Sequence, residues 1–450
     1  MLAMHGYAPT ETAEEADVIL LNTCSVREHA EERAFGKMGL LSKLKRERPD
    51  LILGILGCMA KAQREAIFQR LPQVDLIAGP AELYDLPMLL GEVESRRRQN
   101  GGTPARVAAL DRPFRPLERK PAGDVRKPGV SAFVTIMEGC DKRCSYCIVP
   151  FTRGQEVSRP ADDIVEEVHQ LAAAGYQEVT LLGQNVNSYG KRLPDGSGYR
   201  GRSWDERLRE ELGEDFGDFP ALLRRIDGET DIRRLRFTTS HPFDAHQWLF
   251  EAMRDCDMVC EHLHLPVQSG SNRMLAGMRR GYTVESYRAK VDLLRRLVPE
   301  IALTTDIIVG FPGETEQDCR QTIALMEEVR YDSAFIFKYS PRPGTTAADL
   351  PDDVPPDIKE ERNKRLLALQ ERISLEKNQA LIGHTIEVLV EGPTKRATAS
   401  GANLMGRART NNVVVFAGEP SLTGTLVDVR VREATPFTLI GESVMASVPR

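Results

Sequence analysis

Short apolar runs and charged stretches alternate through the first 80 residues of the chain. The runs at 17–22, 51–56 and 74–78 have the length and composition of buried strands, and the stretches at 26–45 and 61–70 are predicted to be helices. Strands that alternate with helices in this way predict an open, mostly parallel α/β sheet.

The same alternation returns after residue 130 and predicts a second α/β region. Six strands are expected there, at 132–136, 178–182, 235–239, 261–265, 302–309 and 334–339. Six strands are too few for a closed eight-stranded barrel. We therefore expect an open, partial (β/α)6 barrel with its ligands at the carboxyl ends of the strands.

The pattern changes again after a long charged helix, expected at about 357–382. Five short strands separated by turns are predicted beyond it, at 385–390, 407–410, 413–416, 426–431 and 438–442. Strands of this length and number are typical of small OB-like β-barrels, several of which bind RNA.

Two stretches lack a clear periodicity. Residues 92–129 contain several prolines and basic residues and are expected to be a linker, either a solvated connector or a segment that contacts phosphates. Residues 191–219 are expected to be a surface insertion with a short helix at 204–212. The expected order is therefore a first domain at 1–91, the linker, a second domain at 130–382 and a third at 383–445.

Composition narrows the class of protein. The chain has 450 residues, of which 41% are hydrophobic, and a net charge of −6. This length suits two to four domains, and no apolar run approaches the roughly 20 residues that cross a bilayer. The cysteines do not form the framework of a secreted disulfide-rich protein. We expect a cytoplasmic protein without membrane contact, in which any nucleic-acid binding comes from local patches.

Three of the eight cysteines, Cys140, Cys144 and Cys147, share one short loop with C-x3-C-x2-C spacing. Three thiolates without a fourth nearby are an incomplete set for tetrahedral zinc. They suit a four-iron four-sulfur cluster with one iron open to another ligand, and Tyr146 offers a stacking surface beside that iron. The alternative of three packing cysteines is weak, because core cysteines have no reason to share a loop with glycine and lysine.

Cys24 and Cys58 each follow a predicted strand of the first sheet. The carboxyl ends of parallel strands line one crevice, so these two residues indicate a second metal site, against the default of two structural cysteines. Two ligands are too few for a cluster. The sheet lacks an expected first strand, and a third cysteine could be missing with it. Cys256, Cys260 and Cys319 are interpreted as core or near-core thiols.

Polar segments follow the strands of the expected barrel. Gln184 and Asn185 follow the second strand, and 239–242 follow the third. The remaining candidates at this rim are Gln268, Ser269, Arg280, Gly310, Gly313 and Glu314. Each alone is more simply an ordinary polar turn or helix end, but together with the cysteine loop they favour a ligand pocket. His241 is interpreted as a hydrogen-bonded turn residue.

A local positive surface is expected in the third domain. Between residues 392 and 418 the charged side chains are all basic: Lys395, Arg396, Arg407 and Arg409. Such a patch in an acidic protein can bind RNA phosphates. A solvated hairpin tip is the alternative.

The motifs quoted above resemble those of a known family. The cysteine loop resembles the signature of radical S-adenosylmethionine (SAM) enzymes. The segments Asn-Thr-Cys-Ser-Val-Arg-Glu at 22–28 and Gly-Cys-Met-Ala at 57–60 resemble the N-terminal domain of the methylthiotransferases among them. The last domain looks like the RNA-binding TRAM domain. Residues 144–160 and 237–242 most resemble the tRNA-modifying branch of the family.

The resemblance implies two four-iron four-sulfur clusters and SAM as cofactors. Cys140, Cys144 and Cys147 would hold the cluster that cleaves SAM to a 5′-deoxyadenosyl radical. Cys24 and Cys58 would hold the sulfur-donating auxiliary cluster. The family normally supplies a third auxiliary cysteine from an earlier Gly-Cys-Gln-Met-Asn-like segment, which this sequence does not match, so we expect a misassigned or truncated start.

The resemblance also assigns SAM contacts and partners. Gln184, Asn185 and the 310–314 turn would cradle SAM, Gln268 and Ser269 are weaker candidates, and Arg280 matches a basic position near the active site. The partners would be the anticodon stem-loop of a tRNA and a reductant such as flavodoxin or ferredoxin, and the enzyme is expected to be a monomer.

The implied reaction is methylthiolation at C2 of the N6-isopentenyladenosine next to the anticodon, with the methyl group from a second SAM. Two alternatives within the family act on threonylcarbamoyl-adenosine in tRNA or on an aspartate of a ribosomal protein. An alternative of another class is an RNA-binding iron–sulfur protein without catalysis.

Overall fold

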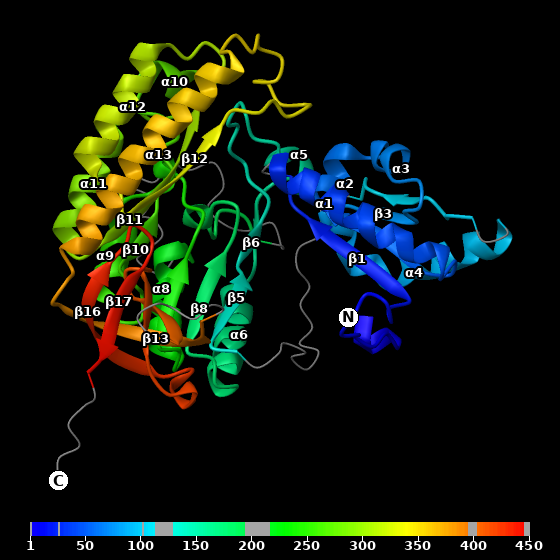
Figure 1. The fold of residues 1–450 in the computed structure, drawn as a ribbon, viewed down its shortest axis with the longest axis horizontal. Coiled ribbons are helices and arrows are strands. Elements are labelled where there is room, and N and C mark those ends of the chain that lie inside the picture. The colour runs from blue at the N-terminus through cyan, green and yellow to red at the C-terminus, as the bar shows by residue number, and fades with distance from the viewer. Residues whose placement is uncertain are drawn as a thin grey trace. The chain divides into compact units, whose positions relative to one another are not determined.

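The computed structural model describes residues 2–25, 28–100, 103–112, 129–193, 217–394 and 403–444 (Figure 1). The described chain divides into two compact units. The first contains the described residues of 1–125, 139–155 and 340–348, and the second those of 126–138, 156–339 and 349–450.

The first unit is built on a four-stranded parallel sheet. Its order is β1 (Val18–Thr23), β2 (Ile52–Gly57), β3 (Leu76–Ala78) and β4 (Val107–Ala109). The short helix η1 (Leu2–His5) precedes β1. The helices between the strands are α1 (Glu28–Leu41), η2 (Ser42–Arg46), α2 (Cys58–Gln63), α3 (Ala66–Arg70), η3 (Pro80–Asp85) and α4 (Leu86–Gln99).

The central strand β2 is buried along its whole length. Leu53 and Ile55 pack in one apolar cluster with α1 and α3, and Ile52 and Leu56 pack in a second cluster with α4. Apolar clusters on both sides of a strand explain its continuous apolar sequence. The predicted open, parallel α/β sheet is confirmed.

The linker predicted at 92–129 is wrong over its first half. Helix α4 extends to Gln99, and β4 adds a fourth parallel strand. The helix buries Leu86, Leu89, Leu90 and Val93, whose spacing marks one helical face. Its last turn looked like a linker because it is arginine-rich, but Arg97 is buried and donates to the carbonyls of 49–51. Residues 113–128 lie outside the described chain.

The second unit contains six parallel strands in two ladders (Figure 1). The first ladder is β5 (Ser131–Thr135), β8 (Glu178–Leu182) and β9 (Arg234–Phe237), and the second is β10 (His262–His264), β11 (Ala302–Val309) and β12 (Ser333–Lys338). A parallel bridge between Leu235 and Val259 joins the ladders. The predicted partial (β/α)6 barrel is therefore confirmed.

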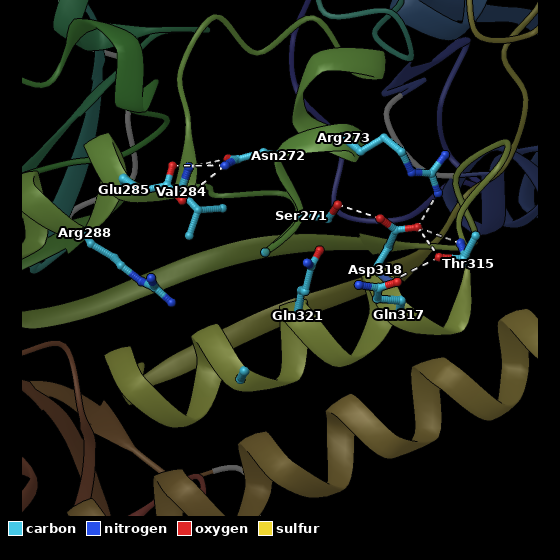
Figure 2. A pocket seen from close by; sticks show the side chains of 12 residues that line it. Ser271, Asn272, Arg273, Val284, Glu285, Arg288, Thr315, Gln317, Asp318 and Gln321 are labelled. Carbon is cyan, nitrogen blue, oxygen red and sulfur yellow. Dashed lines mark hydrogen bonds and ion pairs between the residues drawn. The ribbon is translucent and has the colours of Figure 1, made fainter.

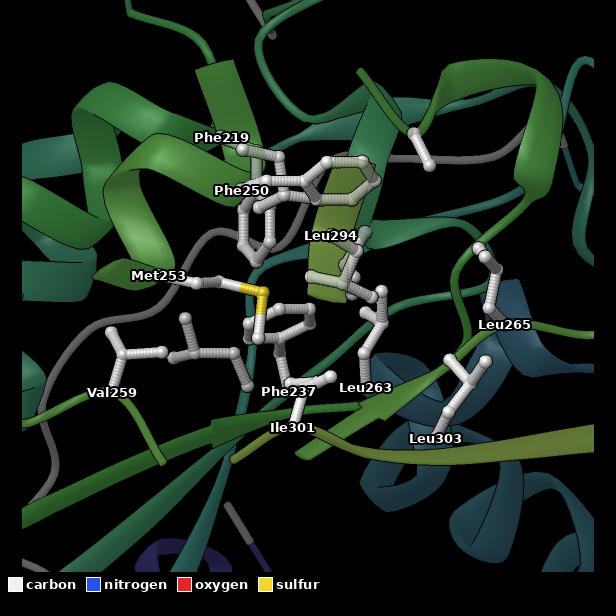
Figure 3. Packing of buried hydrophobic residues seen from close by; sticks show 14 of the residues in the cluster. Phe219, Phe237, Phe250, Met253, Val259, Leu263, Leu265, Leu294, Ile301 and Leu303 are labelled. Atoms are coloured by element: carbon white, nitrogen blue, oxygen red, sulfur yellow. The ribbon is translucent and has the colours of Figure 1, made fainter. Parts of the chain in front are cut away.

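Helices cover one face of these strands. They are α6 (Ala161–Ala173), α8 (Phe219–Glu229), α9 (Gln247–Asp255), α10 (Asn272–Gly277), α11 (Val284–Leu297) and α12 (Glu316–Val329). Short elements complete the connections: β6 (Met137–Glu138), α5 (Val149–Arg153, in the first unit), β7 (Val157–Ser158), η4 (Val186–Ser188) and η5 (Pro242–Asp244). Figure 3 shows part of the core, in which the rings of Phe219 and Phe237 meet edge to face at 5.0 Å.

Alternate residues of the strands therefore face away from the helices. Leu263 and Leu303 belong to the helix-side core, whereas His262, His264 and Thr304 do not. Because side chains alternate along a strand, these polar residues line the inner face of the curved sheet. Most of the insertion predicted at 191–219, including its helix at 204–212, lies outside the described residues.

The chain continues through α13 (Pro356–Gln379) into a closed five-stranded barrel. Its strands are β13 (Thr385–Pro393), β14 (Leu404–Ala408), β15 (Val413–Ala417), β16 (Leu426–Ala434) and β17 (Leu439–Ser443), in the order β13-β14-β15-β17-β16 with η6 (Pro420–Leu422) before β16. The small β-barrel was predicted, but the strand expected at 407–410 ends at Ala408, because a turn with Asn411 at φ 70° follows. No helix in the described residues is long and apolar enough to span a membrane.

Candidate functional site

The cysteine loop is closed at its base by two glycines. Gly139 has φ +78°, and a Cβ atom there would lie 2.0 Å from the carbonyl oxygen of Gln155. The amide of Cys140 donates to the carbonyl of Gly154 at 3.2 Å, and Gly154 also has a positive φ, of 76°. Only glycine fits this crossing, so the backbone itself holds the loop shut around its three thiols.

Cys140, Cys144 and Cys147 are half-buried on this loop, as is Tyr146. The amide of Cys147 donates to the carbonyl of Cys144 at 3.1 Å. None of the chain's cysteines forms a disulfide. No three His, Cys, Asp or Glu side chains in the described chain converge as they do around one ion. A four-iron cluster takes one cysteine per iron, so three cysteines on one loop fit that group.

Cys24 and Cys58 lie at one edge of the first sheet, as predicted. Thr23 pairs with Gly57 across β1 and β2, and the two cysteines are the next residues on these strands. Gly57 has φ +91°, and a Cβ atom there would lie 2.6 Å from the carbonyl of Thr23. Cys24 is exposed and Cys58 is buried. Within the described chain this edge therefore offers two thiols to a second cluster.

Arg153 connects the two cysteine sites. It is the last residue of α5, the short helix that follows the cysteine loop, and its Nε donates to Sγ of Cys58 at 3.3 Å. Both residues belong to the first unit. A charged donor to sulfur stabilises a thiolate ligand more than a thiol. This contact could not be predicted from the sequence, because its two residues are 95 positions apart.

Glu31 forms a second link beside these sites. Its carboxylate is 5% exposed and accepts hydrogen bonds from the Ser25 hydroxyl, from Gln63 at 3.2 Å and from Arg342 at 3.5 Å. Ser25 directly follows Cys24, so the carboxylate holds the residue next to this thiol. A buried carboxylate is stable only with such partners.

The segment 340–348 completes this link. It carries Arg342, and the amide of Ala347 donates to the carbonyl of Ser145, between two of the loop cysteines, at 2.8 Å. A late segment of the chain therefore contacts both cysteine sites of the first unit.

The rim residues of the second unit have mixed roles. The amide of Asn185 donates to Asp244 at 2.6 Å and to Ser188 at 3.0 Å, and its oxygen accepts from the backbone amide of His241 at 3.1 Å. These bonds use its polar atoms to join two rim loops. The prediction that Asn185 contacts SAM is therefore replaced by a positioning role. His241 accepts from the amide of Phe243 at 3.2 Å, as expected for a turn residue.

Other buried polar atoms at this rim have no hydrogen-bond partner among the residues that the structure describes. They are Oε1 of Gln184, both amide atoms of Asn187 and Oγ of Ser240. Asn187 is 1% exposed. Buried polar groups are normally paired, so these orphaned atoms at the ends of β8 and β9 fit the polar groups of a ligand such as SAM. The sequence indicated Gln184 but missed Asn187.

The turn at 310–314 is braced from within. The carboxylate of Glu314 accepts from the amide of Gly310 at 2.7 Å and pairs with Arg362 at 2.7 Å. Burial raises the pKa of Glu314 above its usual value despite this arginine. Gly310 packs against Lys359, and Gly313 donates to Asp353 at 2.6 Å. The side chain of Glu314 holds the turn through its Oε2 atom, and its contact with SAM stays a prediction.

The predicted residues of the segment 266–282 also bond to neighbouring groups of the protein. Gln268 has a positive φ of 72°, and Ser269 contacts Thr322 at 3.3 Å. Arg280 is 5% exposed and donates to the carbonyl of Pro266 at 2.9 Å and to the hydroxyl of Tyr282 at 3.0 Å. Arg280 thus positions the loop that carries Gln268.

An open cleft of about 500 Å³ lies over the first turns of α10, α11 and α12 (Figure 2). Its polar side chains pair with one another: Asp318 binds Arg273 and accepts from Ser271 at 2.6 Å. Burial would raise the pKa of Asp318, but the bonds from Arg273, Ser271 and Thr315 hold it well below its usual value. None of the predicted site residues lines this cleft.

The three buried or near-buried thiols interpreted as core residues are confirmed. Cys256, Cys260 and Cys319 are 4%, 1% and 1% exposed. Burial raises the pKa of Cys256 to about 12 and that of Cys319 to about 11. Thiols of this kind are not available as thiolate ligands.

The predicted RNA patch is only partly described. Lys395 and Arg396 lie outside the described residues. Arg407 pairs with Glu391 at 2.9 Å. Arg409 makes two bonds to Glu261, at 2.7 and 2.8 Å. Arg407 and Arg409 therefore each have a carboxylate partner, and their contact with RNA phosphates stays a prediction.

Arg409 belongs to an anchor between the two barrels of the second unit. Arg236 donates to the carbonyls of Ala408 and Arg409 at 2.7 and 2.8 Å, and the fully buried Arg234 donates to that of Arg407 at 2.6 Å. Arg234 is the first residue of β9 and Arg236 is the third, so the β14–β15 turn sits toward the amino end of this strand, away from the rim at its carboxyl end. Burial would raise the pKa of Glu261, but Arg409 holds it below its usual value.

Comparison with known proteins agrees with this architecture. The sequence profile of the Radical SAM superfamily matches residues 134–326, that of the uncharacterized protein family UPF0004 matches 1–79, and that of the TRAM domain matches 379–444. The structure of a radical SAM methyltransferase, TsrM from Kitasatospora setae with cobalamin and a [4Fe-4S] cluster bound, has a similar fold, with a TM-score of 0.52 and 17% identity over 77% of this chain and 68% of that one. Fold and cysteine loop together define a radical SAM protein.

Full-length relatives make the assignment narrower. The tRNA-2-methylthio-N(6)-dimethylallyladenosine synthase of Moorella thermoacetica is 46% identical over 98% of this chain and 92% of its own length. The enzyme of the same name from Carboxydothermus hydrogenoformans is 45% identical over 98% and 94%. The chain belongs to the family of tRNA-2-methylthio-N(6)-dimethylallyladenosine synthases, which confirms the resemblance seen in its motifs.

Proposed function

We propose that this chain methylthiolates C2 of N6-isopentenyladenosine next to the anticodon of tRNA. One structural observation carries the proposal beyond family membership: both cysteine sites belong to one compact unit, and Arg153 bonds from the helix of one site to Cys58 of the other. Sulfur insertion needs a radical source and a sulfur source near each other. A protein with one structural or redox-sensing cluster would have no need of this link.

The cofactors, when bound, supply a radical able to open an unactivated C–H bond, together with the sulfur and the methyl group. Cys140, Cys144 and Cys147 would hold the SAM-cleaving cluster, and Cys24 and Cys58 would serve the auxiliary one. Gln184, Gln268, Gly310, Gly313, Glu314 and Tyr146 remain the proposed SAM contacts, and we add Asn187 because its buried amide is unpaired. The chain's own task is to hold these groups and to exclude water.

Domain roles and partners complete the proposal. Residues 1–91 would form the auxiliary-cluster domain, 130–382 the SAM domain and 383–445 the RNA-binding domain. Lys395 and Arg396 are the main candidates for phosphate contacts to the anticodon stem-loop. The proposal includes a flavodoxin- or ferredoxin-type reductant, a monomeric enzyme and a cytoplasmic location, where tRNA is found.

The test is anaerobic reconstitution of the full chain with iron, sulfide, SAM and a strong reductant, followed by analysis of RNA. Release of 5′-deoxyadenosine together with the 2-methylthio nucleoside in an isopentenylated anticodon stem-loop is expected. Absence of 5′-deoxyadenosine would favour a non-catalytic RNA-binding protein. Product on threonylcarbamoyl-adenosine RNA or on a ribosomal-protein aspartate, and none on isopentenylated RNA, would assign the alternative substrate.

A further inference from the structure

The inner face of the six-stranded sheet carries an ordered group of polar and aromatic side chains. His262 and His264 of β10, Thr304 and Asp306 of β11, and Phe335 of β12 all lie on the face without helices. The pairing of His264 with Thr304, and of Asp306 with Phe335, makes neighbours of them across the strands. None of them was indicated by the sequence motifs, and none has a role in the function proposed above.

The polar members form a chain of close polar contacts. Oγ1 of Thr304 lies 3.2 Å from Nε2 of His262 and 3.0 Å from Nδ1 of His264, and Nε2 of His264 lies 3.5 Å from a carboxylate oxygen of Asp306. Both ring nitrogens of His264 therefore have a polar neighbour, and these neighbours hold the plane of its ring.

An aromatic surface borders this chain. The ring of Phe335 is 49% exposed and meets the ring of His264 at 6.2 Å and 70°. The ring of Phe337, two residues along the same face, is nearly parallel to it, at 6.5 Å and 9°. The two rings together form one apolar surface on which a flat ligand can stack.

These features together match one kind of ligand. A flat heterocycle can stack on Phe335, beside the ring of His264, and its edge can bond to the carboxylate of Asp306. The carboxylate of Asp306 disfavours a phosphate. An extended single-stranded base, splayed out of its loop, has both the face and the edge that this wall offers.

We infer that the wall formed by His264, Asp306 and Phe335 receives the purine base of the target nucleoside. This assignment rests on the proposed function and adds to it the residues that select the base. The adenine of SAM has the same chemistry, so the experiment distinguishes these two sources. His262 and Thr304 act as positioning residues, since they hold the ring of His264.

The experiment uses the full chain, reconstituted, and an anticodon stem-loop with the fluorescent base 2-aminopurine at the target position. Stacking on Phe335 quenches this base in the wild type. Phe335→Ala should restore the fluorescence and lower the rate of methylthiolation at limiting isopentenylated RNA about tenfold, the loss expected for one base–aromatic stack. Phe335→Leu keeps an apolar side chain but removes the aromatic ring. It should therefore show the same restored fluorescence and the same loss of rate as Phe335→Ala. Phe437→Ala, an equally aromatic position that is 75% exposed on the small barrel, should change neither signal.

Cleavage of SAM in the absence of RNA shows whether the purine on this wall belongs to the target nucleoside or to SAM. Unchanged release of 5′-deoxyadenosine by Phe335→Ala supports the target base, whereas a parallel tenfold loss would assign the wall to SAM and overturn the inference. Unchanged quenching and product rate in both Phe335 variants would also overturn it. If the wild type quenches the base through Phe335 but makes no methylthiolated product, the base-binding wall stands and the proposed function fails.

Discussion

Nε of Arg153 lies 3.3 Å from Sγ of Cys58, and this contact joins the helix behind one cysteine site to a ligand candidate of the other. Helix α5 follows the cysteine loop directly, so its last residue has a fixed relation to Cys147. Arg153 therefore extends from the helix next to the first cysteine site and can change the reduction potential of a cluster bound at Cys58.

Replacing Arg153 with methionine should make the auxiliary cluster harder to reduce. Hydrogen bonds to cluster sulfurs raise the reduction potential, and loss of a charged donor worth about 1.5 kcal/mol corresponds to roughly 65 mV for one electron. Potentiometric titration followed by electron paramagnetic resonance measures this shift. Arg143→Met, an exposed arginine of the same loop, is the control. Equal potentials in both variants would show that the Arg153 contact has no electronic effect.

Gly139→Ala should abolish iron binding by the cysteine loop. The new Cβ atom would lie 2.0 Å from the Gln155 carbonyl at a φ of +78°, so the base of the loop has to open. Iron content and visible absorption report the loss, with SAM cleavage as a second readout. Gly91→Ala, in α4 with open space around it, should instead stabilise the first unit by about 0.5–1 kcal/mol. Full iron content in Gly139→Ala would contradict the role given to this crossing.

Arg409→Met should loosen the anchor of the small barrel without changing the salt dependence of RNA binding. Its charge is already neutralised by Glu261, so no phosphate contact is lost. Lys395→Met should reduce the slope of log K against log salt by about 1, as expected for one phosphate contact. Limited proteolysis and salt titrations separate the two effects. If Arg409→Met also reduces the slope of log K against log salt, Arg409 contacts an RNA phosphate.

Replacing His262 with asparagine should make the folding stability of the second unit less dependent on pH below 7. Burial, with Arg236, His264 and Arg407 nearby, lowers the pKa of His262 to about 3 from an ordinary value of 6.5. The unfolded chain takes up a proton below pH 6.5 that the folded chain accepts only near pH 3. Stability is therefore lost as the pH falls through this window, by up to about 1.4 kcal/mol per pH unit. Calorimetry between pH 7 and 4 should show a shallower decline for the variant than for the wild type.

Local sequence was sufficient for most of the fold. The apolar runs that became β1, β2 and β11 are continuous or alternate clearly, and the residues after β1 and β2 had to share one edge of a parallel sheet, which placed Cys24 and Cys58 correctly. Helix α4 was not predicted. Its residues 92–99 were assigned to the linker because most of their side chains are charged or polar and hide the apolar stripe of the helix.

Contacts between distant positions were not predictable in this way. Arg342 reaches Glu31 across 311 residues, and Arg409 reaches Glu261 across 148. A lone basic residue looks the same in sequence whether a carboxylate or a phosphate neutralises it. The inner wall had only a weak local signal, since His262 and His264 flank the apolar Leu263 whereas Thr304 and Asp306 flank another threonine. Only the helix-covered sheet shows which face they occupy.

The segment 340–348 has a consequence for the order of synthesis. Arg342 and Ala347 reach Glu31 and the Ser145 carbonyl, yet they leave the ribosome long after both. At roughly 5–20 residues per second, about 10–40 s separate residue 155 from residue 340. Throughout that interval the nascent chain exposes its thiols without the segment that braces them. The surroundings of the two cysteine sites are therefore complete only after residue 348 has been synthesised.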